Sequence, residues 1–162
     1  MVKGLAKQAR LDGSGLHVVV LRTSWNEEIV SALVEGCKKE LSESGVTKIT
    51  EHQVPGAYEL PFASRRLIES LEPRPDAVVA IGCLIKGDTM HFEYICEAVS
   101  QNLMRVGLDA DVPVIFGVLT CLNETQAKAR AGLVDGHHNH GPEWGAAAVA
   151  MARLPRKRAS AA

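Results

Sequence analysis

The middle of this 162-residue sequence contains the apolar run Ala77-Val78-Val79-Ala80-Ile81-Gly82-Cys83. It is rich in β-branched residues and does not alternate between polar and apolar positions. Such a run is typical of a β-strand covered on both faces, as strands are in parallel sheets. Runs of the same character lie at 16–21 and 112–119, and a fourth run at 46–54 alternates more. We expect the fourth run to form a strand that is half exposed or at a sheet edge.

Segments with helical spacing of apolar residues separate and follow these runs. They cover residues 27–44, 58–71, 91–106, 124–133 and 144–150. Asn123 is the expected cap of the helix that begins at residue 124. Strands that alternate with helices predict crossover connections and a parallel sheet between helical layers. The predicted fold class is therefore α/β: a three-layer α/β/α sandwich, flavodoxin-like, with a central four-stranded parallel sheet.

The length and composition indicate one folded domain. Hydrophobic residues make up 46% of the chain and the formal net charge is −1, so a broad nucleic-acid-binding surface is not expected. We expect the domain to span residues 16–153, preceded by an arm (1–15) and followed by a disordered tail (154–162).

Composition also bears on location. The longest apolar runs are too short to cross a membrane, so no membrane partner is expected. The cysteines lie far apart in the sequence, at Cys37, Cys83, Cys96 and Cys121. This spacing favours reduced thiols over disulfides or a zinc site, and we expect a cytoplasmic protein.

Chemically informative residues follow the predicted strands. Ligands of open parallel sheets bind outside the carboxyl ends of the strands. Trp25 follows the first strand, where it can stack on a flat heterocycle or plug the top of the core. Asn26 beside it can hydrogen-bond a ligand or cap a helix. Glu59 follows the turn at 55–57. Its carboxylate can accept hydrogen bonds from ligand hydroxyl groups, or it can stabilise the start of its helix by a favourable interaction with the helix dipole.

The third strand leads into Gly87-Asp88-Thr89 at the start of a helix. Free backbone N–H groups at a helix start favour an anion such as phosphate. An ordinary capped helix start is the alternative, and the Asp88 carboxylate would repel a phosphate. His91 in the first turn can act as a base or proton relay near neutral pH, or be an ordinary surface histidine.

A histidine-rich stretch holds His137, His138 and His140. Its spacing matches no helical metal-binding pattern, and the sequence suggests no carboxylate or thiolate partner. We therefore expect a polar loop between the last two helices, without a metal.

Several segments resemble the lumazine synthase family, in order and spacing, from about residue 4 to residue 152. The resemblance rests on 54–61 (VPGAYELP), 81–94 (IGCLIKGDTMHFEY), 113–120 (PVIFGVLT), 127–132 (AKARAG) and 138–141 (HNHG). The Trp25-Asn26 pair and the stretch 138–145 are most similar to fungal members.

The resemblance implies roles for particular residues. Trp25 would stack on a pyrimidine ring, and His91 would transfer protons. The ribityl chain would be held by Asn26, Gly56, Ala57, Tyr58 and Glu59, and the polar edge of the pyrimidine by backbone at Leu84, Ile85 and Lys86. Phosphate would be held by Asp88, Thr89, Arg130 and His140. Phe116, Arg130 and His140 would come from a neighbouring subunit, which implies a homo-oligomer built on a pentamer.

The implied reaction condenses 5-amino-6-(D-ribitylamino)uracil with 3,4-dihydroxy-2-butanone 4-phosphate and needs no cofactor or metal. Two departures from the family pattern bear on the phosphate contact. Asp88 stands where small residues are frequent, and His140 stands where bacterial members often have Lys.

Two other functions fit parts of the pattern. A non-catalytic lumazine- or riboflavin-binding protein would keep Trp25 but would not need Thr89, His91 and Arg130 together. A phosphoryl-acceptor regulator would need an acidic cluster at the strand ends, where this chain has other residue types.

Overall fold

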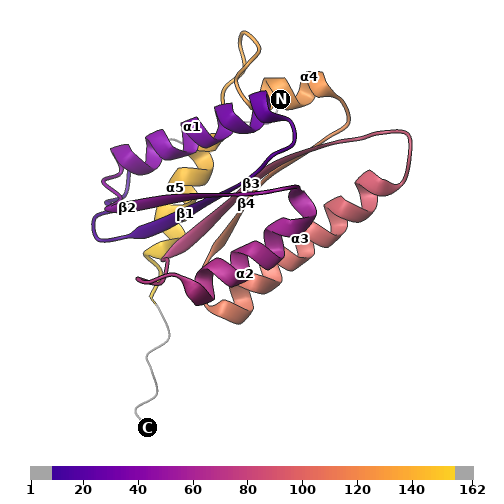
Figure 1. The fold of residues 1–162 in the computed structure, drawn as a ribbon. Coiled ribbons are helices and arrows are strands. Elements are labelled where there is room, and N and C mark those ends of the chain that lie inside the picture. Colours follow the sequence, from indigo (N-terminus) through magenta and orange to yellow (C-terminus); the bar gives the residue numbers. More distant parts are fainter. Residues whose placement is uncertain (1–8, 156–162) are drawn as a thin grey trace.

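A four-stranded parallel sheet forms the centre of the computed structural model, which describes residues 9–155 (Figure 1). Its strand order is β2-β1-β3-β4. The strands are β1 (His17–Thr23), β2 (Lys48–Val54), β3 (Ala77–Ile85) and β4 (Val114–Cys121). Residues 1–8 of the predicted arm and 156–162 of the predicted tail lie outside the described residues. The parallel four-stranded sheet confirms the predicted fold class.

Helices cover both faces of the sheet (Figure 1). One layer contains α1 (Glu27–Glu43), α4 (Glu124–Arg130) and α5 (Gly141–Ala152). The other contains a 3-10 turn, η1 (Ala57–Glu59), with α2 (Leu60–Ser70) and α3 (His91–Ala110). Two apolar clusters fill the spaces between sheet and helices, one under each layer. Within residues 9–155, no helix is both long and apolar enough to cross a bilayer.

The outer strands differ from the central pair in exposure. β2 lies at an edge with half-exposed and exposed positions, as its alternating sequence predicts. β4 forms the other edge, and its Phe116 side chain is 41% exposed. The prediction that this run is covered on both faces is therefore wrong at Phe116 and Thr120. These residues share a face of β4 with the buried Val118, but the helices on that face do not cover them.

Three helix ends differ from the sequence prediction. α3 continues through Gly107 to Ala110 and ends before Asp111, which has a left-handed φ of 52°. α4 stops at Arg130, three residues earlier than predicted. α5 begins at Gly141 rather than at residue 144, because the Asn139 side chain accepts a 2.7 Å hydrogen bond from the Gly141 N–H.

Close contact between α1 and α5 fixes the segment before α5. A Cβ atom on Gly141 would lie 2.1 Å from the Leu33 carbonyl oxygen, and one on Gly145 would lie 2.8 Å from the Cys37 carbonyl. Glycine lets the two backbones approach to this distance. The residues just before Gly141 are therefore held against α1 at the rim of the sheet.

Candidate active site

The loops that follow β1, β2 and β3 are joined at the carboxyl ends of these strands. Asn26 has a left-handed backbone (φ 54°), and its side-chain amide donates to the Cys83 carbonyl at 3.0 Å. The Ser24 N–H donates to the Val54 carbonyl, also at 3.0 Å. The β1–α1 loop is thus bonded to the ends of both neighbouring strands. Asn26 occupies the helix-cap position of α1, but its side chain makes no cap hydrogen bond.

A cleft of about 1160 Å³ opens between these loops and α3. It brings together nine of the residues proposed from the sequence, which come from four different segments. They are Trp25, Asn26, Gly56, Ala57, Tyr58, Glu59, Leu84, Ile85 and His91. A cleft of this size can hold a ligand larger than a single heterocycle.

Trp25 stands free at the mouth of the cleft. Its side chain is 72% exposed, so the alternative in which it plugs the core is wrong. The turn after β2 faces it: a Cβ atom on Gly56 would lie 3.6 Å from Trp25 Cδ1 and 3.1 Å from Glu59 Oε2. Gly56 therefore lies between an indole ring and a carboxylate, and a larger residue there would crowd both.

The end of β3 contributes main chain to the cleft. β1 pairs with β3 as far as Ile81, whereas β3 continues to Ile85. The last residues of β3 therefore have a backbone edge that does not pair with β1. Leu84 and Ile85 lie there, and both residues line the cleft. Such an edge offers backbone donors and acceptors to a planar ligand.

Lys86 is held in place by contacts to two other segments. Its N–H donates to the Cys121 carbonyl at 2.9 Å. Its ammonium group bonds the Glu93 carboxylate, which lowers the pKa of Glu93. The Lys86 N–H is thereby used in the sheet, and Lys86 is not among the residues that line the cleft.

The start of α3 carries His91, whose exposed side chain lines the cleft. The His91 N–H donates to Thr89 Oγ1 at 3.4 Å, and the residue at the cap position is Met90, without a side-chain cap. Asp88 therefore does not cap this helix. Asp88 and Thr89 are exposed and lie beside the cleft rather than among its lining residues.

Arg130 and His140 form a second polar group next to the end of β4. Arg130 Nη1 lies 3.1 Å from His140 Nε2, and His140 Nδ1 lies 2.9 Å from Glu143 Oε2. The charge of Arg130 acts on Cys121, where it opposes the rise in pKa caused by burial of that thiol. In the described chain, Arg130, His140 and the exposed Phe116 do not line the cleft.

Comparison with known proteins bears on what this cleft does. Residues 15–156 match the family model described as 6,7-dimethyl-8-ribityllumazine synthase. The chain belongs to this family. Proteins with that name from Schizosaccharomyces pombe and Pyricularia oryzae are 49% and 43% identical to it, and the matches cover 87% and 86% of this chain and 89% and 88% of theirs. A Mycobacterium avium protein with the same name is 42% identical, over 95% of this chain and 94% of its own.

Membership of the lumazine synthase family confirms the resemblance and the enzyme class inferred from the sequence. It does not test the individual residue roles, which remain proposals. The non-catalytic binding protein and the phosphoryl-acceptor regulator find no support in these matches.

Sequence reasoning missed part of the lumazine synthase cleft. One face of α3 lines it beyond His91, with Tyr94, Ile95, Glu97, Ala98, Gln101 and Asn102. Their spacing from His91, at three, four, six, seven, ten and eleven residues, is that of one helix face. That periodicity was the available signal. Thr23, also in the cleft, has a buried hydroxyl without a hydrogen-bond partner among the described residues.

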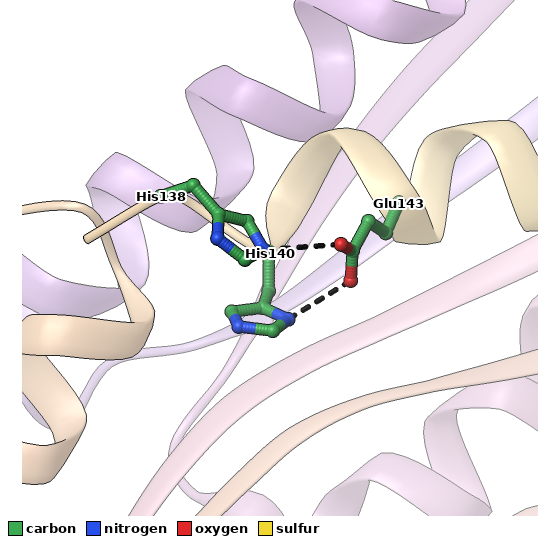
Figure 2. A group of neighbouring side chains, drawn as sticks. All are labelled: His138, His140 and Glu143. Carbon is green, nitrogen blue, oxygen red and sulfur yellow. Dashed lines mark hydrogen bonds and ion pairs between the residues drawn. The ribbon is translucent and has the colours of Figure 1, made fainter. Parts of the chain in front are cut away.

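Glu143 was missed as well. Figure 2 shows its carboxylate beside the rings of His138 and His140, with one oxygen bonded to each ring. No carboxylate partner was expected for these histidines from the sequence. The available signal was the spacing of three residues between His140 and Glu143, with Pro142 at the start of a helix.

Proposed function

We propose that this chain condenses 5-amino-6-(D-ribitylamino)uracil with 3,4-dihydroxy-2-butanone 4-phosphate to give 6,7-dimethyl-8-ribityllumazine, phosphate and water. The single observation that carries this proposal is the cleft in which an exposed Trp25 lies beside Gly56 and Glu59, with His91 lining the same space. This arrangement offers a flat apolar surface, a carboxylate acceptor and a proton-transfer group to one ligand.

The pyrimidine substrate binds in the cleft of this chain. Its ring stacks on Trp25, and its polar edge meets backbone groups of Leu84, Ile85 and Lys86. The ribityl hydroxyls bond to the turn at 56–59 and to Asn26. Because the Asn26 amide N–H is used by Cys83, its side-chain oxygen remains to accept a bond from a hydroxyl group.

The phosphate of the second substrate lies between the start of α3 and Arg130. Thr89 supplies a hydroxyl and, with Asp88, backbone N–H groups. Arg130 carries five donors and uses one of them toward His140. The others are free to bind phosphate oxygens, and His140 adds a further polar contact.

The reaction proceeds by proton transfers. The 5-amino group attacks the ketone and loses water to form a Schiff base. Phosphate is then eliminated, and the ring closes with loss of a second water. His91 moves protons in these steps, while Arg130 stabilises the departing phosphate. Much of the acceleration comes from holding two substrates in contact, so the proposal includes no cofactor and no metal in the reaction.

The complete site is formed between two chains of a homo-oligomer, for which we propose a pentamer. The support is that Arg130, His140 and Phe116 lie outside the cleft of their own chain. Large apolar side chains are also exposed, among them Met104, Leu108, Phe116 and Leu122. Exposed apolar surface of this kind marks contacts with partners. The cytoplasmic location remains a proposal, supported by free cysteines at 37, 83, 96 and 121.

Two measurements test the shared site. Sedimentation velocity distinguishes a pentamer from a monomer or a larger shell. Refolding a mixture of Gly56→Trp chains and Arg130→Ala chains creates sites with an intact cleft from one chain and an intact Arg130 from its neighbour. The mixture is assayed at a phosphate-substrate concentration too low for either variant alone to be active. Activity recovered in the mixture supports the shared site, whereas a monomer or an unchanged mixture contradicts it.

The catalytic proposal itself is tested by mixing the two substrates and following the lumazine chromophore. Product above the uncatalysed rate is expected. A protein that binds lumazine or riboflavin without accelerating product formation would be a carrier, and the proposal would be wrong.

A further inference from the structure

The connection between α4 and α5 and the first turn of α5 bring together three side chains of metal-binding types outside the cleft: His138, His140 and Glu143. His138 Nε2 lies 3.1 Å from Glu143 Oε1, and His140 Nδ1 lies 2.9 Å from Glu143 Oε2 (Figure 2). One ligand atom of each residue lies within 4.8 Å of the other two. The two rings lie close together, with centroids 4.5 Å apart.

The backbone that carries these side chains is fixed by its own hydrogen bonds. Asn139 donates to the Ala32 carbonyl of α1 and accepts from the Gly141 N–H, both at 2.7 Å. The His140 N–H donates to the Arg130 carbonyl at 3.0 Å. The three side chains therefore come from a segment that is already ordered, and binding an ion there has a small entropic cost.

The distances are close to those of a coordination sphere. Zinc–nitrogen and zinc–oxygen bonds are roughly 2.0–2.2 Å long, so tetrahedral ligand atoms lie about 3.3 Å apart. The observed separations of 3.1 and 2.9 Å join the two histidines to different oxygens of the Glu143 carboxylate, and one ligand atom of each residue lies within 4.8 Å of the others. The carboxylate must therefore turn for one of its oxygens and both nitrogens to share an ion. The rings must also turn toward a common point. His138 has room to do so because its side chain is 65% exposed.

We propose that His138, His140 and Glu143 bind a divalent transition-metal ion of the zinc class. The ligands are His138 Nε2, His140 Nδ1 and the Glu143 carboxylate, and water fills the fourth position. Imidazole and carboxylate donors suit zinc, cobalt(II) and nickel(II). The proposal does not depend on the proposed function, because the cluster binds an ion whether or not Arg130 contacts phosphate.

Occupation of this site changes the bonding of Arg130. In the absence of a metal, His140 Nε2 accepts from Arg130 Nη1, so the ring proton is on Nδ1 and points to Glu143. An ion on Nδ1 displaces that proton to Nε2 of the same neutral ring. Two N–H groups then face each other, and Arg130 loses its acceptor. The number of protons on the ring is unchanged, but one Arg130 donor is released for another partner.

The test is a calorimetric titration of untagged protein with zinc chloride in a phosphate-free buffer. We expect one ion per chain. His138→Ala and Glu143→Gln should each weaken binding by more than roughly tenfold, the scale seen even when a residue outside the ligand set is lost. The control is His137→Ala, because His137 is exposed in the same loop and lies outside the cluster. It should bind zinc as the unaltered protein does.

The proposal is overturned if the unaltered protein shows no saturable binding, or if either cluster variant binds as tightly as His137→Ala. Circular dichroism checks that the variants are folded. If a variant is not, nitrogen NMR of the unaltered protein decides. Zinc should shift the ring nitrogens of His138 and His140, move the His140 proton to Nε2 and leave His137 unchanged. A His140 ring that keeps its Nδ1 proton in saturating zinc contradicts the proposal.

Discussion

The side-chain amide of Asn26 donates a 3.0 Å hydrogen bond to the carbonyl of Cys83, and this bond joins the loop after β1 to the end of β3. Asn26 achieves it from a left-handed backbone conformation that few residues tolerate. The neighbouring Trp25 is thereby placed over the cleft. The geometry of the proposed pyrimidine site thus depends on Asn26, which both adopts the left-handed backbone conformation and forms the hydrogen bond to Cys83.

Asn26→Ala should lower the free energy of unfolding by roughly 2 kcal/mol, because it loses a hydrogen bond and strains the left-handed backbone. Asn26→Gly is the matched control, since glycine tolerates this conformation and loses the bond alone. Urea denaturation should therefore rank the original protein above Asn26→Gly, and Asn26→Gly above Asn26→Ala. Equal stability of the two variants would show that the backbone is not strained at this position.

Trp25→Ala should weaken binding of the pyrimidine substrate about three- to tenfold, the value of an aromatic stacking contact, with little loss of stability. Trp144→Ala should do the opposite. Trp144 packs on β4, where a Cβ on Gly117 would lie 3.0 Å from its ring, so its loss should cost on the order of 3 kcal/mol. Steady-state kinetics and thermal unfolding of both variants check this. A Trp25→Ala enzyme with unaltered KM would refute stacking.

Arg130→Ala should raise the KM for the phosphate substrate roughly 10- to 100-fold, because charge-assisted hydrogen bonds of about 1.5–3 kcal/mol are lost. His91→Ala should instead lower kcat, by about 100-fold, as expected when a proton-transfer group is removed. Arg105→Ala is the control for removing a surface arginine, since Arg105 pairs with Asp109 on α3. Full activity in both Arg130→Ala and His91→Ala would mean that the roles are wrongly assigned.

Much of this architecture follows from local sequence. β1 and β3 are dense in Val and Ile because both faces are covered, and that pattern can be read directly. β4 is just as apolar, yet Phe116 is exposed, because an edge strand can have the same composition as a buried one. The sequence also could not show whether Trp25 stacks on a ligand or plugs the core. Its exposure depends on the hydrogen bonds that hold the β1–α1 loop to the ends of β2 and β3.

Long-range contacts set the features that sequence reasoning missed. α5 begins early because Asn139 caps Gly141, and Asn139 is in turn anchored to Ala32, more than a hundred residues away. Glu143 reaches His138 and His140 as a result. No local pattern in the histidine-rich stretch shows that anchor, so the sequence offered only the spacing between His140 and Glu143 as a signal for the carboxylate partner.

Stability should fall as the pH rises from about 9 to about 12. Burial raises the pKa of Cys37 from 9.0 to about 12. In this range the unfolded chain loses the thiol proton while the folded chain keeps it, so ionisation favours unfolding, by at most about 1.4 kcal/mol per pH unit for one thiol. Cys37→Ala should show a shallower decline in urea denaturation from pH 8 to 11 than Cys96→Ala, whose thiol is less buried. Identical pH dependence would contradict the effect of burial.

The central claim is that this chain makes lumazine and phosphate from the two substrates in the cleft beside Trp25. Its most direct test is to measure both products in one reaction, lumazine by absorbance and inorganic phosphate by a coupled colour assay. We expect the protein to accelerate the formation of both products, and the two products to appear in equal amounts. Phosphate release without lumazine, or neither product above the uncatalysed rate, would contradict it.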